Sequence, residues 1–237
     1  MAENILEENA NSTFLQCISY IKSNEIDKAI SKAQFFIEKC KNVIITERDT
    51  SCFEFANEAL FLGIFFRGIQ NFAHLKQMTV SSDWMKNPEL IEPVWVEMWD
   101  CKERLEYTSP LIKMAGLEWI FNDINSLYQD FYQNFGHGLY VSPGFMVEKT
   151  TCNICGQDTR ACEHISGMIY SSKVCGEIPR GIIGDHTLIT DHPDDPRCRI
   201  WPHNQKREFT EKEGSAYEVH LLSFFMLDDF MYNFESK

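Results

Sequence analysis

The sequence FEFANEALFLGIFFRGIQNFAHL, residues 53–75, carries apolar side chains on nearly every side of a helix rather than on one stripe. A helix of this kind is stable only when other elements cover it all round. Ser51 and Glu54 stand three positions apart at its start, in the pattern of a capping box, which favours a helix that begins here. We therefore expect residues 53–75 to form the central, buried helix of a helical region.

The segments around this helix carry one-sided apolar patterns that predict further helices. Asp27 follows a break in the pattern and is suited to cap a second helix. Asn87 and Pro88 mark the start of another helix, because proline is favoured in the first turn. A last helix runs from about Leu117 to a stop at Gly136. The first two helices are identified by apolar side chains at steps of three and four residues: Phe14, Cys17, Ile18 and Ile21, then Ile30, Ala33, Ile37 and Cys40.

The pattern changes at about residue 140, where glycine, proline and cysteine become frequent and helical periodicity ends. The segments GLYVSPGFMVE (138–148) and GIIGDHTLIT (181–190) predict short strands bounded by turns. Residues 203–216 form a polar connector. Residues 217–234 place apolar side chains on one helical stripe, although a strand over 217–222 is an alternative.

The fold class that these patterns predict is α+β. We expect an α-helical domain over residues 1–140, followed by a small, cysteine-rich and loop-rich α+β region over residues 141–237 that ends in a C-terminal helix.

The composition indicates a globular protein with an acidic surface. Apolar residues make up 44% of the 237 residues, and Asp plus Glu (35) exceed Lys plus Arg (22), for a net charge of −13. This charge argues against non-specific binding to nucleic acid or to an anionic membrane. No window approaches ~18 uninterrupted apolar residues, and the first residues are acidic, unlike those of a signal peptide. We therefore expect a soluble, cytoplasmic protein that does not associate with membranes.

The strongest local pattern is TCNICGQDTRACEHISGMIY, residues 151–170, in a chain with nine cysteines. Disulfides are rare in a reducing compartment, so clustered cysteines favour a metal site. Two cysteines separated by two residues can chelate one ion from a tight turn, and a nearby Cys-x-His pair can complete a tetrahedral shell, for which zinc is the favoured ion. The ligands predicted are Cys152, Cys155, Cys162 and His164, with Cys175 as a competing fourth ligand.

A shell of four protein ligands leaves no open coordination position, so the ion would stabilise the region rather than activate water. Two alternatives remain at this point. The thiols of residues 152–175 can be reduced and free of metal, or the pair Cys152 and Cys155 can be a redox-active Cys-x-x-Cys motif.

A second motif, GDHTLITDHPDDPRCRIWPH, residues 184–203, gathers aspartate and histidine. Asp-Pro sequences of this kind are ordinary turn chemistry. The motif also resembles the metal-dependent HNH nucleases, in which a cysteine zinc site accompanies an Asp-His at a strand end, an asparagine in the next loop and a final histidine; that resemblance implies phosphodiester hydrolysis around His186 and His192. The residues that carry the resemblance are Asp185-His186 or Asp191-His192, then Asn204 and His220.

A third pattern lies on the central helix, where Arg67 and His74 are two turns apart and share nearly the same face. The pair resembles the Arg-x(4–6)-His signature of the HEPN-type helical ribonucleases, which implies action on RNA phosphate. The structural alternative is that Arg67 pairs with an acidic side chain and that His74 is a partly buried histidine.

Taken together, these observations favour a non-catalytic intracellular zinc-binding protein that acts through a protein partner or as a homo-oligomer. The rival hypothesis is a nucleic-acid phosphodiesterase, either HNH-like around His186 and His192 or HEPN-like at Arg67 and His74.

Overall fold

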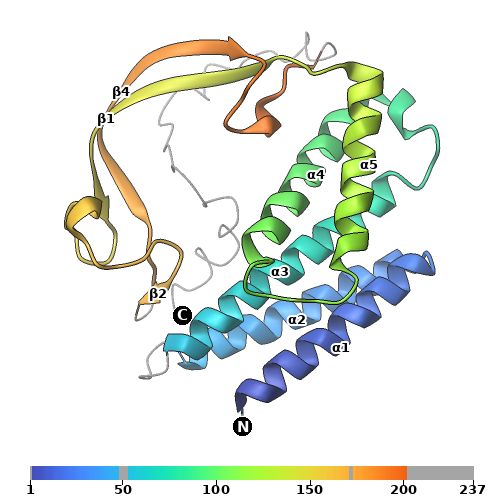
Figure 1. The fold of residues 1–237 in the computed structure, drawn as a ribbon, viewed down its shortest axis with the longest axis horizontal. Helices are drawn as coiled ribbons and strands as arrows, with labels where there is room; N and C mark the ends of the chain where they lie inside the picture. Colours follow the sequence, from blue (N-terminus) through green and yellow to red (C-terminus); the bar gives the residue numbers. More distant parts are fainter. Residues whose placement is uncertain (1, 48–52, 171–172, 202–237) are drawn as a thin grey trace.

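The computed structural model describes residues 2–47, 53–170 and 173–201, and these residues form an α+β fold (Figure 1). A helical body comes first along the chain, and a strand-rich region follows it. The helices of the body are α1 (Ala2–Lys22), α2 (Ile26–Glu47), α3 (Phe53–Met78), α4 (Pro88–Thr108) and α5 (Leu117–Phe135), with a short 3₁₀ helix over Trp84–Lys86. The α+β class predicted from the sequence is therefore confirmed.

Helix α3 is the central helix, as its all-round apolar sequence predicts. It packs between α2 and α4 and also contacts α1. The ring of Phe66 lies 4.3 Å from that of Phe36 on α2, and the ring of Phe65 lies 5.6 Å from that of Phe14 on α1. The predicted capping residue Ser51 lies outside the described residues, and Asp27 lies in the first turn of α2, one residue inside the helix.

Helix α4 begins where the Asn-Pro pair predicts. The Asn87 side chain accepts a hydrogen bond from the Glu89 backbone N–H at 3.1 Å. The helix continues through Pro93, which has no N–H to donate. Its buried Trp95 ring lies against the rings of Phe131 on α5 and Trp201, at 5.0 and 5.9 Å between centroids. This aromatic cluster joins α4 and α5 to the end of the described chain.

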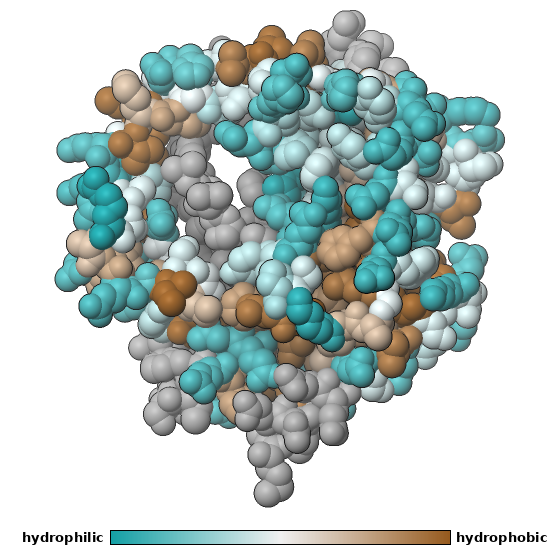
Figure 2. Space-filling view, in the orientation of Figure 1, coloured by the Kyte–Doolittle hydropathy of each residue, from teal (hydrophilic) through white to brown (hydrophobic). Residues whose placement is uncertain are grey.

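The two predicted strand segments form one long ribbon rather than separate short strands. Strand β1 (Tyr140–Cys152) pairs antiparallel with β4 (Glu177–Thr190), from Tyr140 opposite Thr190 to Cys152 opposite Glu177. A register shift between Gly144 and Phe145 lets the pairing continue along the whole length. The ribbon leaves the end of α5 and arches away from the helices (Figure 1). Apolar side chains are exposed along it (Figure 2).

Between the ribbon strands lie residues 152–170 and 173–176, which we call the cysteine lobe. It contains the short strands β2 (Ile169–Tyr170) and β3 (Lys173–Val174), which pair with each other, and a 3₁₀ turn over Thr159–Ala161. The lobe also contacts α3, because the Ile169 backbone N–H donates to the Asn57 side chain at 2.7 Å. The lobe is thus held at both ends by the ribbon and on one side by the body (Figure 1).

The chain returns to the helical body after β4. The 3₁₀ turn Pro196–Cys198 contacts α4, and the Arg197 guanidinium lies within 2.7 Å of carboxylate oxygens of Asp100 and Glu103. Trp201, 4% exposed, belongs to the same apolar core as the helices. The predicted connector 203–216 and the predicted C-terminal helix 217–234 lie outside the described residues, and the division into two domains at residue 140 stays a prediction.

Among the residues that the structure describes, no helix combines the length and the apolar character needed to cross a lipid bilayer.

Candidate metal centre

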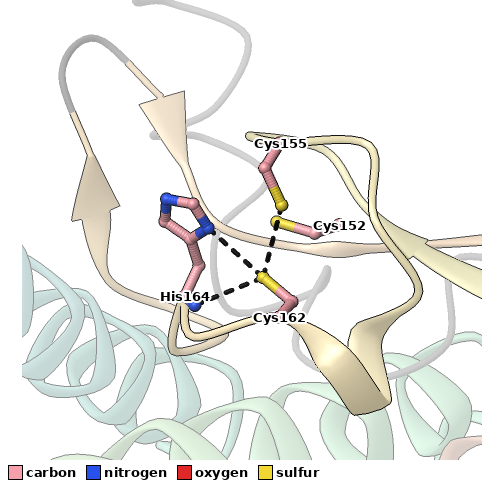
Figure 3. A group of neighbouring side chains, drawn as sticks. All are labelled: Cys152, Cys155, Cys162 and His164. Atoms are coloured by element: carbon pink, nitrogen blue, oxygen red, sulfur yellow. Dashed lines mark hydrogen bonds between the residues drawn. The ribbon is translucent and has the colours of Figure 1, made fainter.

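The first two cysteines of the lobe lie on a tight turn at the end of β1. The Gly156 backbone N–H donates to the Cys152 carbonyl oxygen at 2.8 Å, which closes the turn, and Gly156 has a φ of +73° that favours glycine. Within the turn, the Ile154 backbone N–H points at the Cys152 Sγ at 3.3 Å. The spacing of two residues thus brings the sulfurs of Cys152 and Cys155 to the same side of the chain (Figure 3).

The next two candidate ligands follow a short capped turn. The Asp158 side chain accepts from the Arg160 N–H at 3.0 Å and begins the 3₁₀ turn that leads to Cys162. The His164 Nδ1 lies 3.2 Å from the Cys162 Sγ, and the His164 backbone N–H donates to the same sulfur at 3.2 Å. The rings of His164 and Tyr170 lie edge to face, with their centroids 4.5 Å apart, and this contact restricts the orientation of the imidazole.

These four side chains converge on one point (Figure 3). One donor atom of each of Cys152, Cys155, Cys162 and His164 lies within 4.8 Å of the other three, and the Cys155 and Cys162 sulfurs are 3.5 Å apart. Sulfurs bound to one tetrahedral zinc ion at ~2.3 Å are ~3.8 Å apart. The donor set and its spacing therefore fit a metal ion. The identification of this ion as zinc stays a prediction.

Cys175 lies beside this group. Its sulfur is 3.7 Å from the Cys152 Sγ, and the side chain is only 4% exposed. The convergent group contains His164 and not Cys175, but the sulfur of Cys175 is near enough to replace the imidazole after a small movement. The assignment of His164 as the fourth ligand, with Cys175 as its competitor, stays a prediction.

The sequence patterns did not identify Asn153, which positions Cys175. Its amide nitrogen donates to the Val174 carbonyl oxygen at 2.8 Å, and its side-chain oxygen accepts from the Gly176 N–H at 2.8 Å. This side chain ties the first cysteine turn to the segment that carries Cys175. The only signal in the sequence was an asparagine between two candidate ligands, a residue type that often bonds to nearby backbone.

The thiols of the lobe differ in their acidity in the absence of an ion. Burial opposes ionisation of Cys152, but hydrogen bonds from the Cys155 and Ile154 backbone N–H groups and from neighbouring thiols outweigh it and lower its pKa to about 6. Burial raises the pKa of Cys162 to about 11 and that of Cys175 to about 12. Without an ion, Cys152 is therefore more readily ionised than Cys162 or Cys175, whereas a bound ion deprotonates its cysteine ligands.

The aspartate- and histidine-rich segment 184–203 shows no comparable convergence in its described part, residues 184–201. His186 Nδ1 contacts its neighbour Asp185 at 2.9 Å, and His192 Nε2 lies 3.8 Å from its neighbour Asp191. The side chain of His192 is 94% exposed. The other candidates of the HNH-like pattern, Asn204 and His220, and also His203, lie outside the described residues.

Turn chemistry accounts for part of this segment. The Asp195 side chain accepts from the Arg197 backbone N–H at 3.0 Å and caps the short turn that follows. Among the described residues of this segment, no three aspartate, histidine or cysteine side chains converge as metal ligands. The HNH-like hypothesis stays a prediction.

Arg67 and His74 lie on α3 among polar side chains that we call the polar stripe, which also contains Gln70 and Asn71 on α3 and Glu97 and Arg104 on α4. Arg67 Nη1 donates to Gln70 at 2.5 Å, and burial followed by the nearby Arg104 charge lowers the Arg67 pKa. His74 is half-buried and interacts electrostatically with Glu97 on α4. The structural alternative for Arg67 and the HEPN-like ribonuclease activity both stay predictions.

Three comparisons were made, with protein-family models, with curated proteins and with solved structures, and none of them found a protein that matches this chain.

Proposed function

We propose that this chain is a non-catalytic, cytoplasmic zinc-binding protein whose ion is structural and held by Cys152, Cys155, Cys162 and His164. The observation that carries the proposal is the convergence of these four donor atoms within 4.8 Å of one another. Three thiolates and one imidazole are ligands that zinc prefers, and they fill a tetrahedral shell. An ion held in this way has no open position for water, so it stabilises the lobe rather than catalysing a reaction.

The cytoplasmic location in this proposal rests on the cysteine pattern. Clustered cysteines in a reducing compartment favour a metal site over disulfides. Three cysteines and one histidine, the donor set of such a site, form the convergent group of the lobe.

Metal analysis of the purified full-length chain tests the zinc site. We expect about one zinc ion per chain, a loss of most of it in Cys152→Ser, and no loss in Cys198→Ser, which removes an exposed thiol outside the group. A chain without zinc, or equal metal content in the two variants, would contradict the proposal. The pair His164→Ala and Cys175→Ser decides the fourth ligand, because removal of a direct ligand lowers zinc affinity more than removal of a side chain beside the site, and we expect the larger loss in His164→Ala.

We also propose that the protein acts through protein contacts, with a second copy of the chain as the partner tested first. The ribbon supports this, because Met146 and Ile183 lie opposite each other on the two strands and are 56% and 60% exposed. Ile189, also on the ribbon, is 61% exposed. Exposed apolar side chains that lie next to each other, as Met146 and Ile183 do, are typical of interaction surfaces.

Light scattering on the zinc-loaded protein tests this second half of the proposal. A mass that is a multiple of 27.6 kDa, reduced to one chain by Ile183→Glu, supports self-association through the ribbon. The variant Arg180→Glu is a matched control, because it changes the charge of the same strand at a polar, exposed position. A wild-type mass of one chain would contradict the homo-oligomer.

A further inference from the structure

The four thiols of the cysteine lobe form two pairs that have similar geometry and very different exposure. The sulfurs of Cys155 and Cys162 are 3.5 Å apart, and these side chains are exposed and half-buried, respectively. The sulfurs of Cys152 and Cys175 are 3.7 Å apart, and these side chains are 2% and 4% exposed. Both pairs are near enough to be joined after a small movement, so access from solvent is what distinguishes them.

We propose that the exposed pair, Cys155 and Cys162, is an oxidation site at which hydrogen peroxide forms a disulfide and thereby releases the metal ion. This inference rests on the proposed function, because two of the ligands of the ion are the reactants. It adds a regulated property to the site: the ion stays bound under reducing conditions and leaves when peroxide is present.

The reaction needs only the two cysteines and one molecule of hydrogen peroxide. A metal-bound cysteine is a thiolate, which is the nucleophilic form. The sulfur of Cys155 attacks one peroxide oxygen, the O–O bond breaks, hydroxide leaves, and the cysteine becomes a sulfenic acid. The thiolate of Cys162 then attacks that sulfur and displaces a second hydroxide as the S–S bond forms. The two sulfurs lose two electrons in total, and the two hydroxides take up two protons from solvent to become water.

The disulfide removes two of the four ligands of the ion. A disulfide sulfur carries no negative charge and is a poor zinc ligand, so the ion is left with Cys152 and His164. Even if Cys175 moves onto the ion, only three protein ligands are available. The affinity for zinc therefore falls steeply when the exposed pair is joined.

The buried pair is protected by the structure around it. Cys152 ends β1 and is paired with Glu177, and the Cys175 backbone N–H donates to the Met168 carbonyl oxygen at 2.7 Å. Two hydrogen bonds between the Asn153 side chain and the backbone of Val174 and Gly176 fix the segment that holds Cys175. Peroxide in solvent thus reaches Cys155 before it reaches either sulfur of this pair.

The experiment uses the full-length zinc-loaded chain, and zinc content is measured before any oxidant is added. One equivalent of hydrogen peroxide is then added, released zinc is followed with a chromogenic chelator, and disulfides are mapped by alkylation and peptide mass. We expect at least ~10-fold more Cys155–Cys162 disulfide than Cys152–Cys175 disulfide, and one zinc ion released per disulfide. A thiol reductant with added zinc restores the metal content. Cys198→Ser behaves like the wild type, because that exposed thiol lies outside the cluster.

Two results would overturn the inference: a disulfide that forms first between Cys152 and Cys175, or zinc that stays bound after the exposed pair is joined. Cys175→Ser separates these pathways, because it removes the buried pair and leaves the exposed pair and the four proposed ligands in place. A chain that holds no zinc before peroxide is added contradicts the proposed function, and is thereby distinguished from a failure of the oxidation step.

Discussion

The helical body and the cysteine lobe are held together by different forces. The body buries large apolar side chains on every face of α3 and around Trp95, so the hydrophobic effect is sufficient to stabilise it. In the described residues of the lobe, four apolar side chains are buried, namely Cys152, Ile169, Val174 and Cys175. A segment of this length with so small a core needs another source of stability. We therefore predict that the lobe depends on its proposed ion for stability and that the body does not.

Removal of the ion is the strongest way to test this difference. We expect a zinc chelator to increase amide hydrogen exchange by at least ~100-fold in residues 152–176, because the folding energy of such a lobe comes from metal binding. The helices keep their exchange protection, since their cores contain no ligand of the ion. Hydrogen exchange with mass spectrometry measures both regions in one sample. Equal changes in the body and the lobe would show that the two regions unfold as one unit.

Truncation of Trp95 tests the same difference by weakening the apolar core of the helical body instead of the lobe. Trp95→Ala removes a ring that is 1% exposed and a hydrogen bond from its indole N–H to the Pro196 carbonyl oxygen at 2.6 Å. We expect a loss of ~3–5 kcal/mol in the free energy of unfolding, measured with urea and circular dichroism, and an unchanged zinc content. Tyr132→Ala is the control, because its ring is 41% exposed and the expected loss is below ~1 kcal/mol. Zinc loss in Trp95→Ala at low urea would contradict the separation of the two regions.

The sequence was sufficient to predict the features that depend on local patterns. The all-round apolar segment 53–75 became the central helix, Asn87 became the cap of α4, and the spacing of Cys152 and Cys155 placed both sulfurs on one side. Features that depend on contacts between distant residues were not predicted. The pairing of β1 with β4 over their whole length joins residues that are far apart in sequence, and nothing in the pattern of Gly144 to Val147 sets that register.

The contact of the turn Pro196–Cys198 with α4 was also not predicted. It depends on ion pairs between Arg197 and two carboxylates about a hundred residues earlier in the sequence, those of Asp100 and Glu103. Arg197 lies within 2.8 Å of oxygens of Asp100, Glu103 and Asp195, and this neighbourhood raises its pKa. We expect Arg197→Met to lower the free energy of unfolding by about 2 kcal/mol, because the half-buried carboxylates lose their nearer cation and Asp100 keeps the more distant Arg104, at 3.7 Å. The effect shrinks in the double variant Arg197→Met with Asp100→Asn. A loss that is the same in both backgrounds would show that this ion pair contributes little.

The contact between the lobe and α3 is expected to have a smaller effect. Asn57→Ala removes the acceptor of the Ile169 N–H, a bond of 2.7 Å, and we expect a cost of ~1 kcal/mol confined to the lobe. Faster exchange of the Ile169 amide in the zinc-loaded protein is the measurement. Asn57→Asp keeps an acceptor at this position and serves as the matched control. Equal exchange in the two variants would mean that the side chain acts through packing and not through this bond.

The smallest expected effect comes from Glu97, which lies in the polar stripe between α3 and α4. Burial raises its pKa above the usual value, although the Asn71 amide donates to it at 2.7 Å and His74 and Arg104 act in the opposite direction. A carboxyl whose pKa is raised in the folded state favours folding below its unfolded pKa, and this contribution is lost as the pH rises through the folded pKa. Glu97→Gln keeps an acceptor for Asn71 and carries no charge, so it should be more stable than the wild type at pH 7, by ~0.5 kcal/mol. The difference should vanish on titration to pH 4, where the wild-type carboxyl is protonated. A destabilised Glu97→Gln at pH 7 would instead show that the ion pairs of the stripe outweigh burial, and that the body, like the lobe, depends on a charged group for part of its stability.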